Sequence, residues 1–171
     1  MSASRVLAWF LFFVWAGWAF ALQGWLQRGG SDWVPDIGLV LALSVMARAE
    51  VADTPVLALL AAVARSAFGP EPPIVLLAGF MLVVFLALAA RTTVELAGPL
   101  WRTITALAFV LILNAWFGFA RGMREPLGDP LQASLAYAAL PTAFVSALLA
   151  FAAGPLFAHL PGLTPIRRRK W

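Results

Sequence analysis

Side chains that could carry acid–base or metal chemistry are few in this 171-residue sequence, and they lie in loops or near helix ends. The chain has no cysteine, which excludes disulfides, thiolate metal sites and cysteine nucleophiles. Its single histidine, His159, argues against a histidine-based zinc site. Catalysis requires titratable groups that converge in one place, and here it would depend on loop acids: Asp36, Glu71, Glu125 and Asp129. The sequence therefore predicts a protein that is not an enzyme, with no catalytic residues, no metal site and no cofactor.

The composition places these few polar residues in a membrane protein. Hydrophobic residues make up 63% of the chain, charged residues only 12%, and the mean hydropathy is +0.89. A typical soluble domain has about 25% charged residues. The net charge of +4 comes from basic residues that flank apolar runs, so they predict membrane topology and not nucleic-acid binding. We expect one all-α membrane domain over residues 1–171.

Apolar runs separated by turns with glycine, proline or charged residues predict a bundle of six transmembrane helices. Their expected positions are about 5–27, 34–49, 54–68, 73–91, 101–120 and 131–160, followed by a basic tail at 165–171. A cleaved signal peptide is the alternative for the first run. The uncharged stretch 6–25 exceeds the roughly 7–15 residues of a signal-peptide core, so we expect an uncleaved helix.

The second apolar run is short for a membrane span. Residues 37–47 form about 16 Å of helix, whereas the hydrocarbon core is about 30 Å thick. This helix must either extend to its flanking polar residues or lie packed inside the other helices. A re-entrant pairing of the second and third helices would bury Arg48, Glu50 and Asp53 in mid-membrane, at a cost of several kcal/mol. Two short spans are therefore favoured.

Arginine and lysine residues orient the bundle. If both termini share one side, that side holds eight basic residues: Arg5, Arg48, Arg91, Arg102, Arg167, Arg168, Arg169 and Lys170. The opposite side holds four: Arg28, Arg65, Arg121 and Arg124. The positive-inside rule then predicts that both termini are cytoplasmic. The basic tail should also attract anionic membrane lipid.

Three residues mark the start of the second helix. Trp33 is placed as an interfacial aromatic, and Pro35 suits the first helical turn, where its missing N–H costs nothing. Asp36 then lies beside the free N–H groups of the helix start, where a negative charge is stabilised. The alternative for Asp36 is a partner or ligand contact at the outer rim.

The first helix carries a possible docking face. Trp15 and Trp18 lie at mid-depth, too deep to be interfacial anchors. Gly17 and Ala21 form a small-xxx-small pair, which permits close approach of another helix. These residues are either lipid-facing or packed bulk, or the surface on which a partner's transmembrane helix docks.

Two further polar residues lie in or beside apolar runs. Arg65 either extends its charged end to the membrane interface or pairs with Asp36 or Glu71 on the same side. Asn114 lies deep in the fifth helix, where we expect a hydrogen bond to another helix and not a ligand contact.

The layout resembles the MreD family of bacterial rod-shape-determining proteins. Pro35-Asp36 opens a short leucine-rich helix over 37–46, a charged turn covers 48–53, and a third helix leads to a glycine-bearing loop over 56–69. Chain length, six spans and the basic tail agree with this family. Where many members carry an acid about four residues before that glycine, this chain has Arg65 before Gly69.

The resemblance implies a non-enzymatic scaffold in the inner membrane that takes part in lateral peptidoglycan synthesis and cell shape. Its implied direct partner is an MreC-like single-span protein. An MreB-like filament and the glycosyltransferase and transpeptidase pair are implied as indirect partners. The family fold is similar to the substrate-binding subunits of energy-coupling-factor transporters, so a small-ligand-binding transporter subunit is the alternative function.

Overall fold

The computed structural model describes residues 2–31, 33–91, 98–124 and 129–167, with the backbone alone over 129–138. It is all-α, as predicted, and has six α-helices followed by a 3-10 helix. The helices are α1 (Ala3–Gln27), α2 (Ile37–Met46), α3 (Thr54–Ser66), α4 (Pro73–Ala90), α5 (Pro99–Arg124), α6 (Asp129–Ala158) and η1 (Thr164–Ile166). Four helical segments are long and apolar enough to cross a membrane: α1, α4, α5 and Ala139–Ala158 of α6. The chain is therefore a multi-pass membrane protein.

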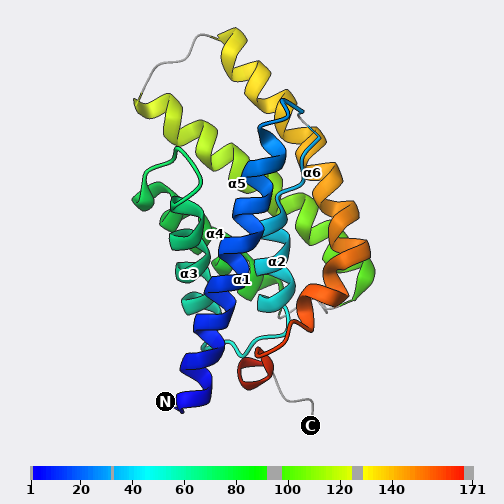
Figure 1. The fold of residues 1–171 in the computed structure, drawn as a ribbon. Coiled ribbons are helices and arrows are strands. Elements are labelled where there is room, and N and C mark those ends of the chain that lie inside the picture. Colours follow the sequence, from blue (N-terminus) through cyan, green and yellow to red (C-terminus); the bar gives the residue numbers. More distant parts are fainter. Residues whose placement is uncertain (1, 32, 92–97, 125–128, 168–171) are drawn as a thin grey trace.

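α2 lies inside the bundle, where it packs against α1, α3, α5 and α6 (Figure 1). Its sequence IGLVLALSVM is apolar on all sides, and all ten of its residues are buried. Ten residues give about 15 Å of helix, half of the roughly 30 Å hydrocarbon core. Of the two alternatives left open by the sequence, packing inside the other helices is therefore the correct one. α3, with 13 residues, is also a short apolar helix.

The other helices follow one another around α2. α1 packs against α3, α3 against α4, α4 against α5, and α5 against α6, while α2 contacts α1, α3, α5 and α6. Among the described residues, α1 and α6 make no helix–helix contact. The ring is thus open at one seam, between α1 and α6 (Figure 1).

Ion pairs fix the turn between α2 and α3 at the end of the bundle where α1 begins. Arg5 contacts Glu50 at 2.6 Å and Asp53 at 2.8 Å, and Trp9 Nε1 donates to Asp53 at 3.2 Å. η1 lies at the same end, where the Glu50 N–H donates to the Ile166 carbonyl. The turn between α2 and α3 therefore lies at an end of the bundle and not at its middle.

Close packing of α1 on α2 depends on a glycine. A Cβ placed on Gly38 would lie 2.1 Å from the Phe20 ring. The same ring packs edge-on against Phe80 of α4, with centroids 6.3 Å apart. Gly38 therefore lets one buried aromatic side chain join α1, α2 and α4.

Two predicted helices need corrected boundaries. The second helix covers Ile37–Met46 and not 34–49, so Pro35 precedes the helix and does not lie in its first turn. The fifth helix ends at Arg124 and not at 120. The charges after Ala120 favour a loop in the sequence, but Arg121 and Arg124 form the last helical turn, where cations are favoured by the helix dipole.

Candidate functional site

A buried ion pair joins the start of α2 to α3. Arg65 Nη1 donates to Asp36 Oδ2 at 2.6 Å, and the two side chains are only 17% and 2% exposed. Asp36 Oδ1 accepts the Leu39 N–H at 3.0 Å, which confirms Asp36 as the acid at the helix start. The Asp36 N–H donates to Ser146 Oγ of α6 at 2.8 Å. Asp36 is therefore not a rim residue but lies inside the bundle, where Arg65 compensates its charge.

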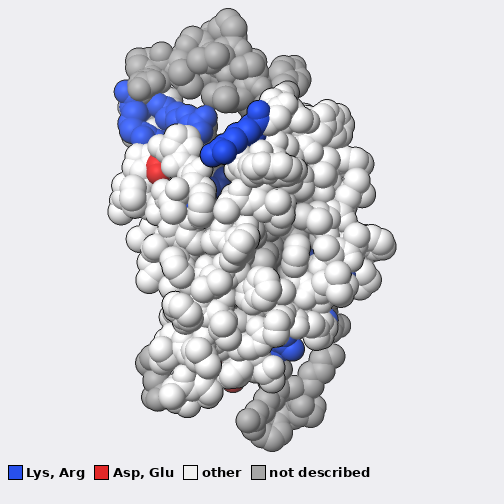
Figure 2. Space-filling view, in the orientation of Figure 1, with Lys and Arg blue, Asp and Glu red and all other residues white. Residues whose placement is uncertain are grey.

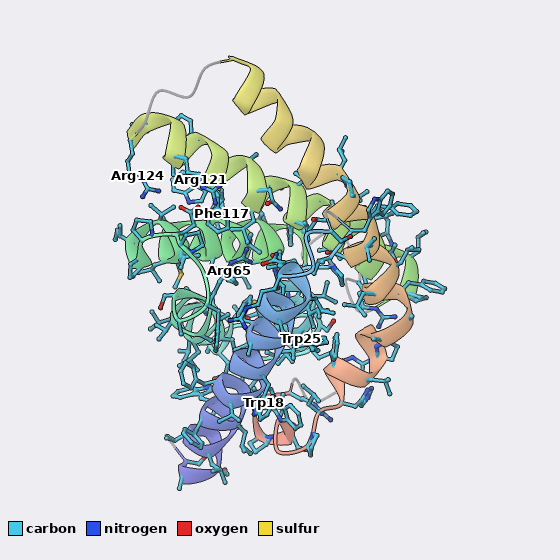
Figure 3. All side chains as sticks on the ribbon, turned by 45° about the horizontal axis from the view of Figure 1, so that its top comes forward. Trp18, Trp25, Arg65, Phe117, Arg121 and Arg124 are labelled. Carbon is cyan, nitrogen blue, oxygen red and sulfur yellow. The ribbon has the colours of Figure 1, made fainter. Side chains whose placement is uncertain are left out.

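Arg65 is held by aromatic rings as well as by Asp36. Its guanidinium carbon lies 5.5 Å from the Phe20 ring centroid and 5.1 Å from that of Phe117. Figure 3 shows Arg65 near Phe117 and Arg121 of α5. Of the alternatives for Arg65, the pair with Asp36 is the one that the structure contains.

A second ion cluster lies at the same end of the bundle. Glu71, in the loop before α4, is buried and accepts from Arg121 on Oε1 and from Arg124 on Oε2, the latter at 3.1 Å. Basic side chains gather around a hollow at this end of the molecule (Figure 2). The cluster explains why α5 continues past Ala120, because its last turn supplies both arginines.

Between these two clusters lies a cavity of about 230 Å³. Its walls come from α1, α3, α4, α5 and the loop before α4, and the residues that line it include Gln23, Gly24, Arg65, Glu71, Asn114, Phe117, Gly118 and Arg121. Gln23 is 6% exposed, and its Oε1 has no hydrogen-bond partner among the described residues. Among the described residues Asn114 does not make the predicted interhelical bond; its Nδ2 donates to Val110 O of its own helix at 2.8 Å. The cavity thus contains polar side chains whose bonding capacity the bundle does not fully use.

A different, apolar groove of about 280 Å³ lies at the open seam. It is lined by Leu11, Val14, Trp15 and Trp18 of α1 and by Pro161 and Gly162 after α6. Trp18 is 71% exposed and is labelled in Figure 3, whereas Trp15 is half-buried against the core. A Cβ on Gly17 would meet no described atom within 4 Å, and Ala21 is half-buried. Space therefore remains beside Gly17 on α1 in the described part of the chain.

The described acids serve as ion-pair partners. Asp36, Glu50, Asp53 and Glu71 each contact an arginine. Within the described part of the chain, no group of three or more His, Asp and Glu side chains could hold a metal ion. Of the loop acids considered for catalysis, Glu125 lies outside the described residues, as does the side chain of Asp129.

Sequence reasoning missed the role of two residues in the cavity. Gln23 is the one amide within the apolar run of α1, and this was the available signal. The sequence places Arg121 in a loop, so its approach to Glu71 is not predicted. Comparisons of the chain with protein-family models, with curated proteins and with solved structures find no match.

Proposed function

We propose that this protein is a non-enzymatic membrane scaffold of the bacterial machinery for lateral peptidoglycan synthesis. Its direct partner is an MreC-like single-span protein, through which it acts with an MreB-like filament and the glycosyltransferase and transpeptidase pair. The resemblance of the sequence to MreD-like proteins suggests this role. The groove at the α1–α6 seam is the observation that supports it best.

The seam suits a partner's transmembrane helix for three reasons. The ring of helices is open there, so docking does not require the bundle to separate. Gly17 and Ala21 do not line the groove, but they lie on the same helix as Trp15 and Trp18 and permit close backbone approach, which favours helix association in lipid through packing. Trp18 offers a large, rigid surface beside them. The partner would therefore be held by a helix face and not by a separate binding domain.

The proposal includes six passages through the inner membrane with both termini in the cytoplasm. α2 and α3 are short for spans, so each would complete its passage together with flanking residues, as at the buried Asp36 that precedes α2. A reporter fused after Trp171 should be active in the cytoplasm, and one inserted after Gly128 should be active in the periplasm. Periplasmic activity after Trp171, or cytoplasmic activity after Gly128, would contradict this orientation.

The function is tested by depletion in the cell. Rod-shaped cells that lose the protein should become round while synthesis of peptidoglycan precursors continues, because a scaffold directs synthesis without catalysing it. Cell width and the precursor pool are measured together. Cells that keep their rod shape after depletion would contradict the scaffold function.

A second candidate function is the small-ligand-binding subunit of a transporter, and the polar cavity at the end opposite η1 favours it. A transporter subunit should purify with an ATPase module and retain its ligand. A scaffold should purify with a single-span partner instead.

A further inference from the structure

The polar cavity has an excess of hydrogen-bond donors in its arginine side chains. Both oxygens of Asp36 are occupied, by the Leu39 N–H and by Arg65. Both oxygens of Glu71 are occupied, by Arg121 and Arg124. A guanidinium has five N–H donors, yet among the described residues Arg65 donates only through Nη1. Donors of the arginines therefore remain for a bound group.

The charge around the cavity is also positive among the described side chains. The three arginines of the two clusters face two carboxylates, Asp36 and Glu71. Arg65 is fixed between Phe20 and Phe117, so its guanidinium is oriented before any ligand arrives. Preorganised arginines are suited to anionic oxygens.

Gln23 adds a requirement for a donor on the ligand. Its buried Oε1 has no partner in the described part of the chain, and it lines the same cavity. An unpaired buried acceptor destabilises the folded protein unless a donor reaches it. A simple anion would satisfy the arginines but not this oxygen. The ligand should therefore carry a hydroxyl group beside its anionic group.

We infer that the cavity binds a hydroxylated phosphate of the glycerol phosphate class, with the phosphate at Arg65 and Arg121 and a hydroxyl group at Gln23. A phosphate is favoured over a carboxylate because its oxygens point in several directions and can meet arginines from two helices, α3 and α5. The volume of about 230 Å³ is below the roughly 300–1,000 Å³ of pockets for drug-sized ligands. It suits a headgroup-sized ligand, either free or as the head of an anionic phospholipid.

This site is separate from the proposed partner groove. It names a class of ligand for the second candidate function, but ligand binding here does not require that the protein transports the ligand.

The purified protein is placed in phosphatidylcholine nanodiscs, and its thermal unfolding is followed by tryptophan fluorescence. In one arm sn-glycerol 3-phosphate is added. In the other arm the nanodiscs contain phosphatidylglycerol. A ligand that binds the folded state raises the unfolding temperature. A rise in the first arm indicates a free phosphate, and a rise in the second arm alone indicates a lipid headgroup.

Matched variants show whether the rise comes from the cavity. Gly24→Leu fills it, since a Cβ there meets no described atom within 4 Å, and Gly17→Leu is the control on the same helix outside the cavity. We expect Gly24→Leu to abolish the rise and Gly17→Leu to keep it. Gln23→Leu should weaken binding by about tenfold through loss of one hydrogen bond. Arg121→Gln should weaken it at least as much, while the exposed Arg28→Gln should not.

Absence of any rise in both arms would overturn the inference. The inference would also fail if Gly24→Leu and Gly17→Leu reduced the ligand-induced rise in unfolding temperature equally. The same holds for an equal reduction in Arg121→Gln and Arg28→Gln, because equal effects indicate unspecific attraction. None of these results bears on partner recovery through α1, so the ligand site and the scaffold function can fail separately.

Discussion

Arg65→Leu should lower the free energy of unfolding by about 3 kcal/mol, because it leaves the Asp36 carboxylate buried without its counter-charge. This loss is at the low end for breaking a buried pair, because Arg65 is 17% exposed and borders the polar cavity. The loss is measured by denaturant unfolding in detergent. Arg28→Leu is the control, since Arg28 is exposed at the same end of the molecule, and it should change stability by less than about 0.5 kcal/mol.

The double variant Asp36→Asn with Arg65→Leu tests the reason for that loss. The introduced amide would keep an oxygen for the Leu39 N–H but has no charge, so the helix start is preserved while the unpaired carboxylate is removed. At least half of the lost stability should return. If the double variant is as unstable as Arg65→Leu alone, packing of Arg65 between Phe20 and Phe117 carries the stability, and the ion pair does not.

Variants of the α1 face should have the largest effect on partner binding. Trp15→Ala with Trp18→Ala removes the aromatic walls of the groove, and recovery of the single-span partner should fall by about tenfold or more, as for aromatic hot spots elsewhere. Gly17→Leu should have a similar effect by a different cause, because a larger side chain prevents close helix approach. Recovery is quantified after purification in gentle detergent.

Trp101→Ala is the matched control for this surface, because Trp101 is an exposed tryptophan on α5. It should leave recovery unchanged. If the α1 variants retain full recovery while Trp101→Ala reduces it, the partner binds another face of the bundle.

The sequence was sufficient for the membrane class and for the order of the six helices, because apolar runs and their proline and glycine boundaries are local signals. The role of Asp36 at the helix start could also be predicted from local sequence, because its carboxylate accepts the N–H of Leu39, only three residues later. The sequence left two alternatives for α2, extension to its flanking polar residues or packing inside the other helices. Its composition favours the second, because a helix that is apolar on every side is expected to be buried on every side.

Contacts between distant segments could not be chosen from local signals. Arg65 had two acids within reach on its side of the membrane, and only the packing of α3 against α2 and α1 assigns it to Asp36. The hydrogen bond of Asn114 is local instead, because its Nδ2 donates to the Val110 carbonyl one turn earlier on its own helix. The cavity forms where four helices and a loop come together, and the hydrophobic periodicity of a single helix does not predict such an arrangement.

Recovery of partners with the wild-type protein tests the scaffold proposal most directly. The tagged protein is extracted from its own membranes in gentle detergent, and the proteins that accompany it are identified by mass spectrometry. We expect an MreC-like single-span protein, recovered with the wild type and depleted from Gly17→Leu. Recovery of an ATPase module together with a retained small ligand, and of no such single-span protein, would contradict the scaffold function and favour the transporter subunit.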